Sequence, residues 1–375
     1  MTLPVFICRK NINVRSGAGR MIASQARFLG QRNHAVTVSC EKLGRGGRDA
    51  LAIASLQYMS KPTRLLLPAV LRDQLYSKRA AQFRSTTGGA IIDHGQSIGA
   101  AAISYVHNFM APEFAGRLGG YLPHQDRQMK FWGGIPDHAT IVANSQIVRR
   151  GLLEMVDFPE QKVVVVYPGY APERFSSATR RSLRASSRNE LGIDDEQILI
   201  GLITSGDFEK RGLGQFLECI AEIRRENRGV RALVLGGSRR PRNLTSHPLF
   251  RTGALLFQES SLIPEKYFAA LDVFLYPARY EEFGIVVLEA MAMGIPVVTS
   301  TAVGASELVA QVANELVVGA PPGDDVATYC DRVTQVLQMS EARGAELSSA
   351  LEEVAFRHTE DQHNASIRAF LVPGA

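Results

Sequence analysis

The sequence has few cysteines, no long apolar run and no recognisable metal-binding motif. Its cysteines lie far apart, with no Cys-x-x-Cys pair and no histidine cluster at zinc-site spacing: Cys8, Cys40, Cys219 and Cys330. This excludes a disulfide scaffold and a zinc finger, and it predicts reduced, buried thiols.

Apolar segments such as 65–71 are far shorter than the roughly 20 residues of a membrane-spanning helix. The N-terminus does not resemble a signal peptide. We therefore expect a cytoplasmic protein whose membrane contact, if any, is peripheral.

The 375 residues are 45% hydrophobic and 21% charged, which is typical of a globular protein of two domains. The charge is unevenly distributed. Residues 1–170 hold 21 Lys and Arg against 10 Asp and Glu, whereas residues 171–375 hold 21 against 27. Residues 1–84 alone hold 15 against 3. No stacking series of aromatic residues or nucleic-acid-binding module accompanies this excess, so nucleic acid is not expected. We expect an anionic membrane surface or a phosphorylated glycolipid as the partner, with a merely solvated face as the alternative.

Short β-branched runs alternate with helical patterns, which indicates an α/β protein with parallel sheets. The first 40 residues predict a strand over 3–8, a glycine-containing loop over 11–20, a helix over 21–33 and a strand over 35–40. Further strands are predicted over 88–95, 102–109, 139–145 and 162–169. These elements predict a doubly wound, Rossmann-like domain over 1–170.

The segment 171–196 is rich in Ser, Arg and acidic residues and shows no sustained core pattern, so it is predicted to be a linker. A second series of strands and helices then runs over 197–355. It predicts a second doubly wound domain that faces the first across a cleft. In such folds ligands bind at the carboxyl ends of the strands.

The segment 277–309 carries the strongest pattern. Glu281 lies in a predicted loop and Glu289 on the helix that follows it. Backbone N–H groups around Gly284, Ile285 and Val286 would begin this helix, where the helix dipole favours a diphosphate. The glutamates could accept hydrogen bonds from sugar hydroxyls. The alternative is that Glu281 or Glu282 is only a favourable first-turn acid and that Glu289 is a solvated helix residue.

This segment resembles the signature of the retaining, GT-B-fold glycosyltransferases of family 4, including the bacterial lipopolysaccharide-core enzymes. The matching residues are Pro277, Glu281, Phe283, Gly284, Glu289, Ala290, Met291, Ala292, Gly294, Pro296, Val297 and Val298. The resemblance implies that Glu281 holds donor-sugar hydroxyls and that Glu289 holds the nucleotide ribose. It places Phe283 in the donor site and implies that a last helix over 356–375 crosses back to the first domain.

A basic pair, Lys210 and Arg211, follows the first strand of the second domain and suits a pyrophosphate. Taken alone, such a pair is often a solvated turn. Its position resembles the family's basic pair, although Ser205 stands where many members carry a further arginine. The sequence has no acidic pair at the end of a predicted strand that could hold a magnesium ion. We therefore expect no metal and no cofactor. The catalytic set implied by the resemblance is Glu281, His107, Lys210 and Arg211.

In the first domain, Ser16–Arg20 contains a G-x-G fragment but lacks the third glycine of a dinucleotide fingerprint, which disfavours a dehydrogenase. In the family the corresponding loop faces the donor phosphates, and Gly17 would be its key residue.

His94 and His107 end predicted strands of the first domain. A histidine in such a place is structural or catalytic, and for His94 both interpretations stay open. His107 resembles the family's histidine beside the transferred sugar. We predict that His94, Asn108 and Glu113 line the acceptor site.

The resemblance therefore implies a retaining glycosyltransferase, and the lack of an acidic pair at a strand end predicts that it is metal-independent. It would move a hexose-type sugar from a nucleotide-diphosphate sugar, UDP rather than GDP, to a glycan or glycolipid of the cell envelope, such as lipopolysaccharide. The alternatives are a catalytically silent binding or scaffold protein of the same fold, and a nucleotide-sugar epimerase.

Overall fold

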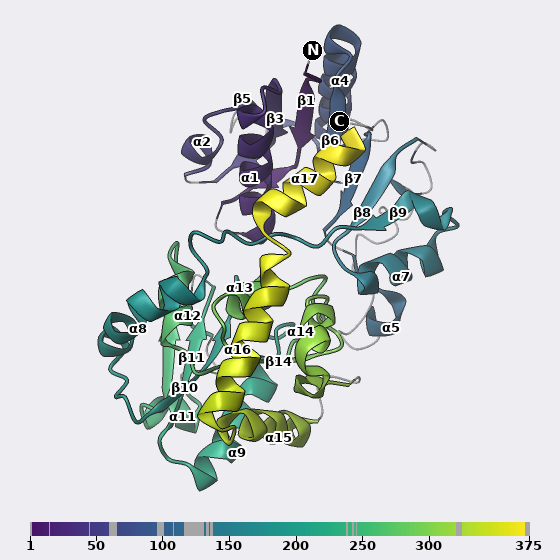
Figure 1. The fold of residues 1–375 in the computed structure, drawn as a ribbon. Coiled ribbons are helices and arrows are strands. Elements are labelled where there is room, and N and C mark those ends of the chain that lie inside the picture. Colours follow the sequence, from purple (N-terminus) through teal and green to yellow (C-terminus); the bar gives the residue numbers. More distant parts are fainter. Residues whose placement is uncertain are drawn as a thin grey trace. The chain divides into compact units, whose positions relative to one another are not determined.

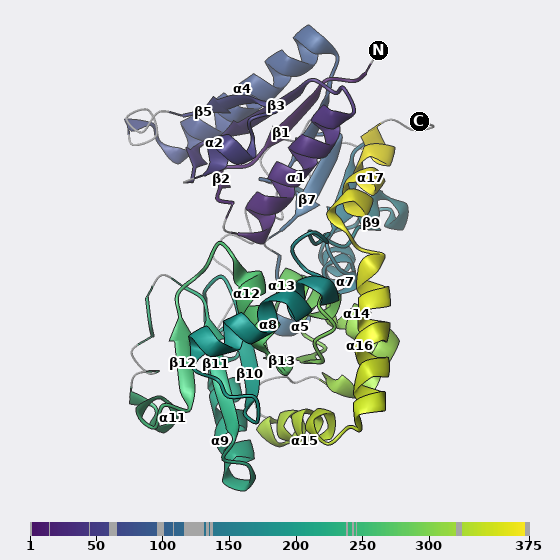
Figure 2. The same cartoon turned by 60° about the vertical axis from the view of Figure 1, so that its left-hand side comes forward.

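The structure is a computed structural model, and it describes residues 2–14, 16–44, 46–59, 66–95, 101–107, 109–115, 131–132, 135, 138–237, 239–241, 244, 246–319 and 325–371. The chain divides into two compact units (Figures 1 and 2). The first comprises the residues up to Gly169 and the last helix, and the second comprises Tyr170–Thr359. The first boundary falls one residue before the predicted one, and the last helix begins at Glu360 rather than at 356.

Among the described residues of the first unit, seven strands form a parallel sheet in the order β5-β3-β1-β6-β7-β8-β9. Those strands are β1 (Val5–Cys8), β3 (Val36–Cys40), β5 (Ser55–Tyr58), β6 (Ala90–Asp93), β7 (Ile103–Val106), β8 (Thr140–Ala143) and β9 (Val163–Val165), beside a small pair, β2 (Asn11–Ile12) and β4 (Lys42–Leu43). The helices are α1 (Gly17–Gln31), α2 (Gly47–Ala50), α4 (Ala69–Thr87), α5 (Pro112–Ala115), α7 (Gln146–Met155), α17 (Glu360–Leu371) and the 3-10 turn η2 (Glu160–Lys162).

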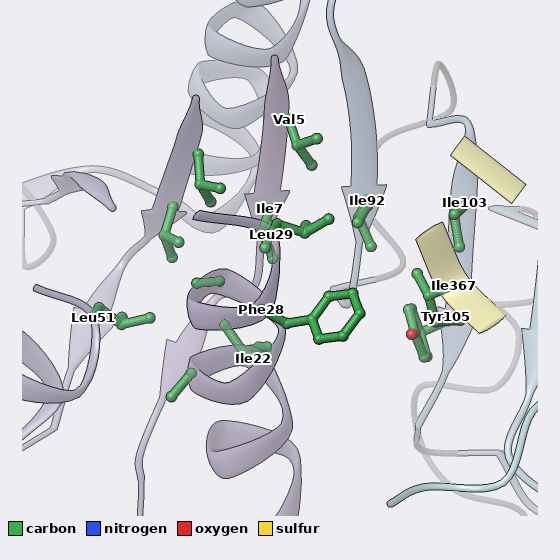
Figure 3. Close-up of a cluster of buried hydrophobic side chains, with 14 of the residues drawn as sticks. Val5, Ile7, Ile22, Phe28, Leu29, Leu51, Ile92, Ile103, Tyr105 and Ile367 are labelled. Atoms are coloured by element: carbon green, nitrogen blue, oxygen red, sulfur yellow. The ribbon is translucent and has the colours of Figure 1, made fainter. Parts of the chain in front are cut away.

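Both faces of this sheet are covered, because side chains alternate across a strand. On β1, Val5 and Ile7 join the core cluster that also includes residues of α1 and Ile367 of α17, whereas Phe6 joins the cluster under α4. Figure 3 shows the first of these clusters, with Tyr105 of β7 among its members. Helix α17, although last in the chain, is thus an integral part of the first unit's core.

Helix α1 begins earlier than predicted. Ser16 is its N-cap, and the Ser16 hydroxyl accepts a hydrogen bond of 3.2 Å from the Gly19 N–H. The glycine pair therefore lies in the first helical turn and not in a loop. At the other end Asn33 adopts a left-handed conformation (φ 64°), as predicted for a residue that follows a helix.

In the second unit, six described strands form a parallel sheet in the order β12-β11-β10-β13-β14-β15. They are β10 (Ile198–Ile203), β11 (Val230–Leu235), β12 (Leu255–Gln258), β13 (Val273–Tyr276), β14 (Val297–Ser300) and β15 (Val317–Val318). The helices are α8 (Ser177–Leu191), α9 (Leu213–Glu226), α11 (Pro248–Arg251), α12 (Pro264–Ala270), α13 (Ile285–Ala292), α14 (Ser306–Ala313), α15 (Val326–Leu337), α16 (Glu341–Phe356) and the 3-10 turn η3 (Asn314–Leu316).

The segment 171–196, predicted as a linker, instead contains the four-turn helix α8 and belongs to the second unit. Its packing face is made of arginines at every fourth position rather than of apolar residues. Arg180 and Arg184 donate hydrogen bonds of 2.9 Å to the Leu271 carbonyl, and Arg188 forms a 3.1 Å ion pair with Asp272. A search for apolar periodicity misses a helix that docks through guanidinium groups.

The predicted burial of the thiols is confirmed, since all four cysteines are buried and form no disulfide. Within the described ranges, no helix combines the length and the apolar character that would let it cross a membrane.

Candidate functional site

The predicted residues of the second unit come together at the carboxyl ends of β10 and β13. These strands are neighbours in the sheet, with β11 on the other side of β10, so the strand order reverses direction between them. Such a switch point is the usual ligand site of a doubly wound sheet. The loop 204–212 after β10 carries Lys210 and Arg211, and the loop 277–284 after β13 carries Glu281. The two loops are joined by a 2.9 Å hydrogen bond from the Arg279 N–H to the Lys210 carbonyl.

Each cation of the basic pair is held by a carboxylate of the neighbouring loop. Arg211 Nη1 lies 2.5 Å from Glu281 Oε2 and donates a 3.0 Å hydrogen bond to the Tyr280 carbonyl. Lys210 Nζ lies 3.2 Å from both carboxylate oxygens of Glu282. These four charged side chains are each at most 16% exposed. A paired and fixed cation of this kind is preorganised for an anionic ligand.

Burial and the paired charges shift the pKa values of this cluster. Burial raises the pKa of Glu282 above its ordinary value, and Lys210 opposes that shift. Burial alone would lower the pKa of Arg211, but Tyr276, Glu281 and Glu282 together raise it above its ordinary value. Tyr276 donates a 3.0 Å hydrogen bond to Glu281 Oε2, and burial raises the pKa of the Tyr276 hydroxyl well above its ordinary range. Arg211 therefore keeps its charge despite being buried.

Two glycines permit the close approach of these loops. Gly212 (φ 72°) lies against the Pro277 carbonyl, so that a Cβ at this position would lie far inside van der Waals contact with that oxygen. Gly284 (φ 89°) packs against Glu281 and Val303, where a Cβ would come within 3.1 Å of each side chain. Both positions also have a left-handed backbone that disfavours any other residue.

Helix α13 begins directly after Gly284, as predicted. Among the described residues, the N–H groups of Ile285 and Val286 have no hydrogen-bond acceptor, so they can receive an anion at the positive end of the helix. Phe283 is buried, and its carbonyl accepts a 2.7 Å hydrogen bond from the Ala305 N–H. Phe283 thus fixes the loop that precedes the helix.

Glu289 lies on α13 and is 2% exposed, so it is not a solvated helix residue. Its charge contributes to raising the pKa of Arg174, although burial acts in the opposite direction and the bonded carboxylate of Glu265 contributes more. Arg174 Nη2 lies 2.5 Å from Glu265 Oε2. Glu289 is therefore a buried carboxylate whose charge acts on Arg174.

In the first unit, Gly17 is the first residue of α1. The glycine whose small size the structure requires is Gly19, because a Cβ there would overlap the Asn13 carbonyl. The motif thus serves close packing of the helix start against the loop before it, and Gly17 itself stays a predicted donor-binding residue.

His94 and His107 form a pair at the ends of β6 and β7. His94 Nδ1 lies 2.8 Å from His107 Nε2, and His94 Nε2 lies 3.0 Å from Gln25 Oε1. His94 is 2% exposed, whereas His107 is partly exposed. Both ring nitrogens of His94 are therefore occupied, which does not fit the prediction that His94 binds an acceptor. His107 remains accessible. Asn108 and the side chain of Glu113 lie outside the described residues.

Sequence reasoning missed several members of these clusters. In the second unit they are Glu282, which pairs with Lys210, and Tyr276, which holds Glu281. In the first unit they are Gln25, Tyr105 and His363, which extend the histidine pair. The adjacent glutamates in the YEEFG segment were a local signal for Glu282. No local signal exists for His363, because its partner Tyr105 lies 258 residues away in the sequence.

Comparison with known families matches residues 200–339 to the model of the glycosyl transferases group 1. The chain is 26% identical over 237 residues to the uncharacterized glycosyltransferase MJ1607 of Methanocaldococcus jannaschii, an alignment that covers 61% of this chain and 60% of that protein. It is 29% identical over 164 residues to the lipopolysaccharide glucosyltransferase WaaG of Escherichia coli K12, with 43% of each chain covered. The chain thus spans about half the length of these relatives.

Solved structures match over nearly the whole chain. The crystal structure of WaaG, described as a glycosyltransferase involved in lipopolysaccharide biosynthesis, superposes with a TM-score of 0.80 at 18% identity, covering 99% of this chain and 100% of that one. Anabaena HepE in complex with UDP-glucose superposes with a TM-score of 0.75 at 17% identity, covering 98% and 99%. At such identities these likenesses establish the fold. The protein therefore has the GT-B fold of two Rossmann-like domains, and residues 200–339 match the model of the glycosyl transferases group 1.

Proposed function

We propose that this protein is a retaining glycosyltransferase that transfers a hexose-type sugar from a nucleotide-diphosphate sugar to a glycan or glycolipid acceptor of the cell envelope. The observation that carries the proposal is the cluster of Lys210, Arg211 and Glu281 at the switch point of the second unit, next to the start of α13. Cations and free N–H groups can bind a diphosphate, and a carboxylate can accept hydrogen bonds from sugar hydroxyls. This cluster offers all three.

Lys210 and Arg211 would neutralise the charge that develops on the diphosphate as the bond between sugar and phosphate breaks. Because each cation is already held by a glutamate, the ligand finds it in place and does not have to order a flexible side chain. The N–H groups of Ile285 and Val286 would contact the same diphosphate, and Glu281 would accept hydrogen bonds from the donor sugar. Glu289 would hold the ribose.

We propose UDP rather than GDP as the nucleotide. The solved complexes of HepE with UDP and with UDP-glucose support this choice at the level of the shared fold. We also propose that transfer needs no metal ion or cofactor, since the two cations can supply the positive charge at the diphosphate. Unchanged turnover in the presence of a chelator would support this, and a strict requirement for a divalent ion would contradict it.

In the first unit, His107 would lie beside the transferred sugar, Gly17 beside the donor phosphates, and Asn108 and Glu113 beside the acceptor. The likeness to WaaG, a lipopolysaccharide glucosyltransferase, supports a cell-envelope acceptor. We further propose that the basic residues within 1–84 dock the protein on the inner, anionic face of the cytoplasmic membrane. Exposed cations on α1 and α2, which pack on the same face of the first sheet, support this; Arg27 and Arg48 are examples.

Vesicle co-sedimentation tests the membrane proposal. Binding should be stronger to anionic than to neutral vesicles and should weaken as salt increases, because exposed charges are screened within about 10 Å at 0.1 M salt. Equal binding to both kinds of vesicle, or binding that salt does not change, would contradict the proposal.

A donor screen that detects release of the free nucleotide tests the activity itself. Release of UDP from a UDP-sugar only in the presence of a separate acceptor identifies a transferase, whereas conversion of the donor alone identifies an epimerase. Calorimetry with UDP and GDP is the second measurement. No binding of either nucleotide by the wild type would favour a silent scaffold protein.

The calorimetry needs variants that separate the site from general stability. We expect Lys210→Ala and Glu289→Ala to weaken UDP binding at least tenfold. The double variant Lys210→Ala/Glu282→Gln removes both charges of one buried pair and guards against loss of folding. Lys266→Ala is the matched control, because Lys266 also pairs with a glutamate of the second unit, Glu190, but away from the switch point. Equal loss of affinity in the control would contradict the assigned site.

A further inference from the structure

A continuous chain of hydrogen bonds runs through the core of the first unit and ends at His107. It connects side chains of α1, β7 and α17 with the histidines that directly follow β6 and β7, and these elements are far apart in the sequence. Its members, in order, are the Tyr167 carbonyl, His363, Tyr105, Gln25, His94 and His107. The order matters because each group can donate or accept only certain hydrogen bonds. The donor or acceptor role at one end of this chain of hydrogen bonds therefore fixes the roles of the groups at the other end.

The direction of the chain is set at Tyr167. Its backbone carbonyl can only accept a hydrogen bond, so His363 Nδ1, 2.9 Å away, carries a proton. A neutral His363 then has no proton on Nε2, so this nitrogen accepts a 3.1 Å hydrogen bond from the Tyr105 hydroxyl. Because Tyr105 has only one hydroxyl proton, its oxygen is left as an acceptor for the next group.

That next group is Gln25, whose Nε2 donates to the Tyr105 oxygen at 3.1 Å. The Gln25 Oε1 must therefore accept a hydrogen bond, which His94 Nε2 donates from 3.0 Å away. A neutral His94 has a bare Nδ1, which accepts from His107 Nε2 at 2.8 Å. His107 is thus protonated on Nε2, and its Nδ1 carries a lone pair.

The opposite direction would need a charged imidazole in the core. If the Gln25 amide were reversed, the Tyr105 hydroxyl would donate to Gln25 and His363 would have to donate through both nitrogens. His363 is 4% exposed, and burial lowers its pKa to about 4. Burial likewise lowers the pKa values of His94 and His107, with Arg9 adding to both shifts. The neutral arrangement is therefore the one favoured at neutral pH.

Ring stacking holds the same groups in place. The rings of His94 and Tyr105 are stacked with centroids 4.1 Å apart and 14° between their planes. The rings of Tyr105 and His107 lie 5.5 Å apart and 6° from parallel. Rotation of either histidine ring would break this stack as well as the hydrogen bonds.

We propose that Gln25, Tyr105 and His363 are positioning residues that hold His107 in the neutral Nε2–H tautomer and present its Nδ1 as a hydrogen-bond acceptor. Among the described residues, the structure gives His107 Nδ1 no hydrogen-bond partner. A ligand group that binds to this nitrogen must therefore donate a hydrogen bond to it. We infer, on the basis of the proposed function, that this group is a hydroxyl of the sugar or acceptor and not an oxygen of the diphosphate.

Histidine tautomers are read directly by long-range proton–nitrogen NMR of the full-length protein with 15N-labelled histidine. A spectrum of His107→Gln assigns the His107 signals. In the wild type at neutral pH we expect His107 to be protonated on Nε2 only. Tyr105→Phe removes the central hydroxyl and Gln25→Leu removes the link to His94, so each should produce a mixture of His107 tautomers. Tyr76→Phe is the matched control, since Tyr76 is another buried tyrosine of the first unit whose hydroxyl has no partner among the described residues.

A His107 that is protonated on Nδ1 in the wild type would overturn the proposal. So would a single unchanged tautomer in both Tyr105→Phe and Gln25→Leu, or an equal change in Tyr76→Phe. These spectra need no substrate, so they remain decisive if the protein proves not to be a transferase. If transferase activity is found, Tyr105→Phe should lower kcat/KM severalfold while Tyr76→Phe leaves it unchanged. Absence of activity with the expected spectra would refute the proposed function alone.

Discussion

Gly212 offers a sharp test of how the two loops of the second unit are held together. A Gly212→Ala change has two costs. The left-handed backbone (φ 72°) disfavours a Cβ by about 1–2 kcal/mol. The new Cβ would also overlap the Pro277 carbonyl, and overpacking of this kind costs a further 1–3 kcal/mol, roughly. We therefore expect the free energy of unfolding of the second unit to fall by about 2–5 kcal/mol.

Gly192→Ala separates the two costs. Gly192 ends α8 in the same unit with a similar backbone angle (φ 64°), but a Cβ there would meet nothing within 4 Å. This control should cost only about 1–2 kcal/mol, because backbone strain is its only penalty. The effect of alanine on the unfolded chain is the same in both variants and cancels in the comparison.

Urea unfolding followed by two probes gives the measurement. The only tryptophan, Trp132, lies in the first unit, so tryptophan fluorescence reports that unit, whereas circular dichroism reports both units. Gly212→Ala should shift the dichroism transition well beyond Gly192→Ala and leave the fluorescence transition unchanged. Equal shifts in the two variants would refute the close packing of Gly212 against Pro277, and with it the geometry of the site.

Three further outcomes follow from the described contacts. Lys210→Ala removes the ammonium group that pairs with the buried Glu282 and should lower the free energy of unfolding by about 3 kcal/mol. Glu282→Gln should restore most of this loss in the double variant, and urea unfolding measures both. Burial lowers the pKa of His363 to about 4 in the folded protein, against 6.5 in the unfolded chain, so the unfolded chain binds more protons between these pH values. The free energy of unfolding should therefore fall by about 3 kcal/mol as the pH drops from 6.5 to 4. His363→Gln should remove this part of the pH dependence of the free energy of unfolding. A thiol reagent should modify none of the cysteines of the native protein at neutral pH, because all four are buried. Burial also raises the pKa of Cys40 to about 11. Rapid labelling would contradict the burial of the cysteines.

The sequence alone predicted most of the secondary structure, because strand and helix patterns depend on residues close together in the chain. The runs that became β1, β10 and β13 were recognisable from their apolar residues. No helix was predicted over Ala69–Thr87, where α4 lies. Helix α8 was also missed, because it docks through Arg180, Arg184 and Arg188 rather than through an apolar stripe. A pattern search based on hydrophobicity finds no signal in such a helix.

The sequence by itself also placed Glu281, Gly284 and Glu289 within one short motif, and the structure has the loop and the helix that the spacing of this motif predicts. Only the tertiary structure decided how charges are paired. Lys210 meets Glu282 across 72 residues, and Tyr105 meets His363 across 258. These contacts depend on the order of strands in each sheet and on the return of α17 to the first unit, which are properties of the whole chain. A local pattern specifies which groups are available, whereas long-range packing decides which of them form hydrogen bonds or ion pairs with one another.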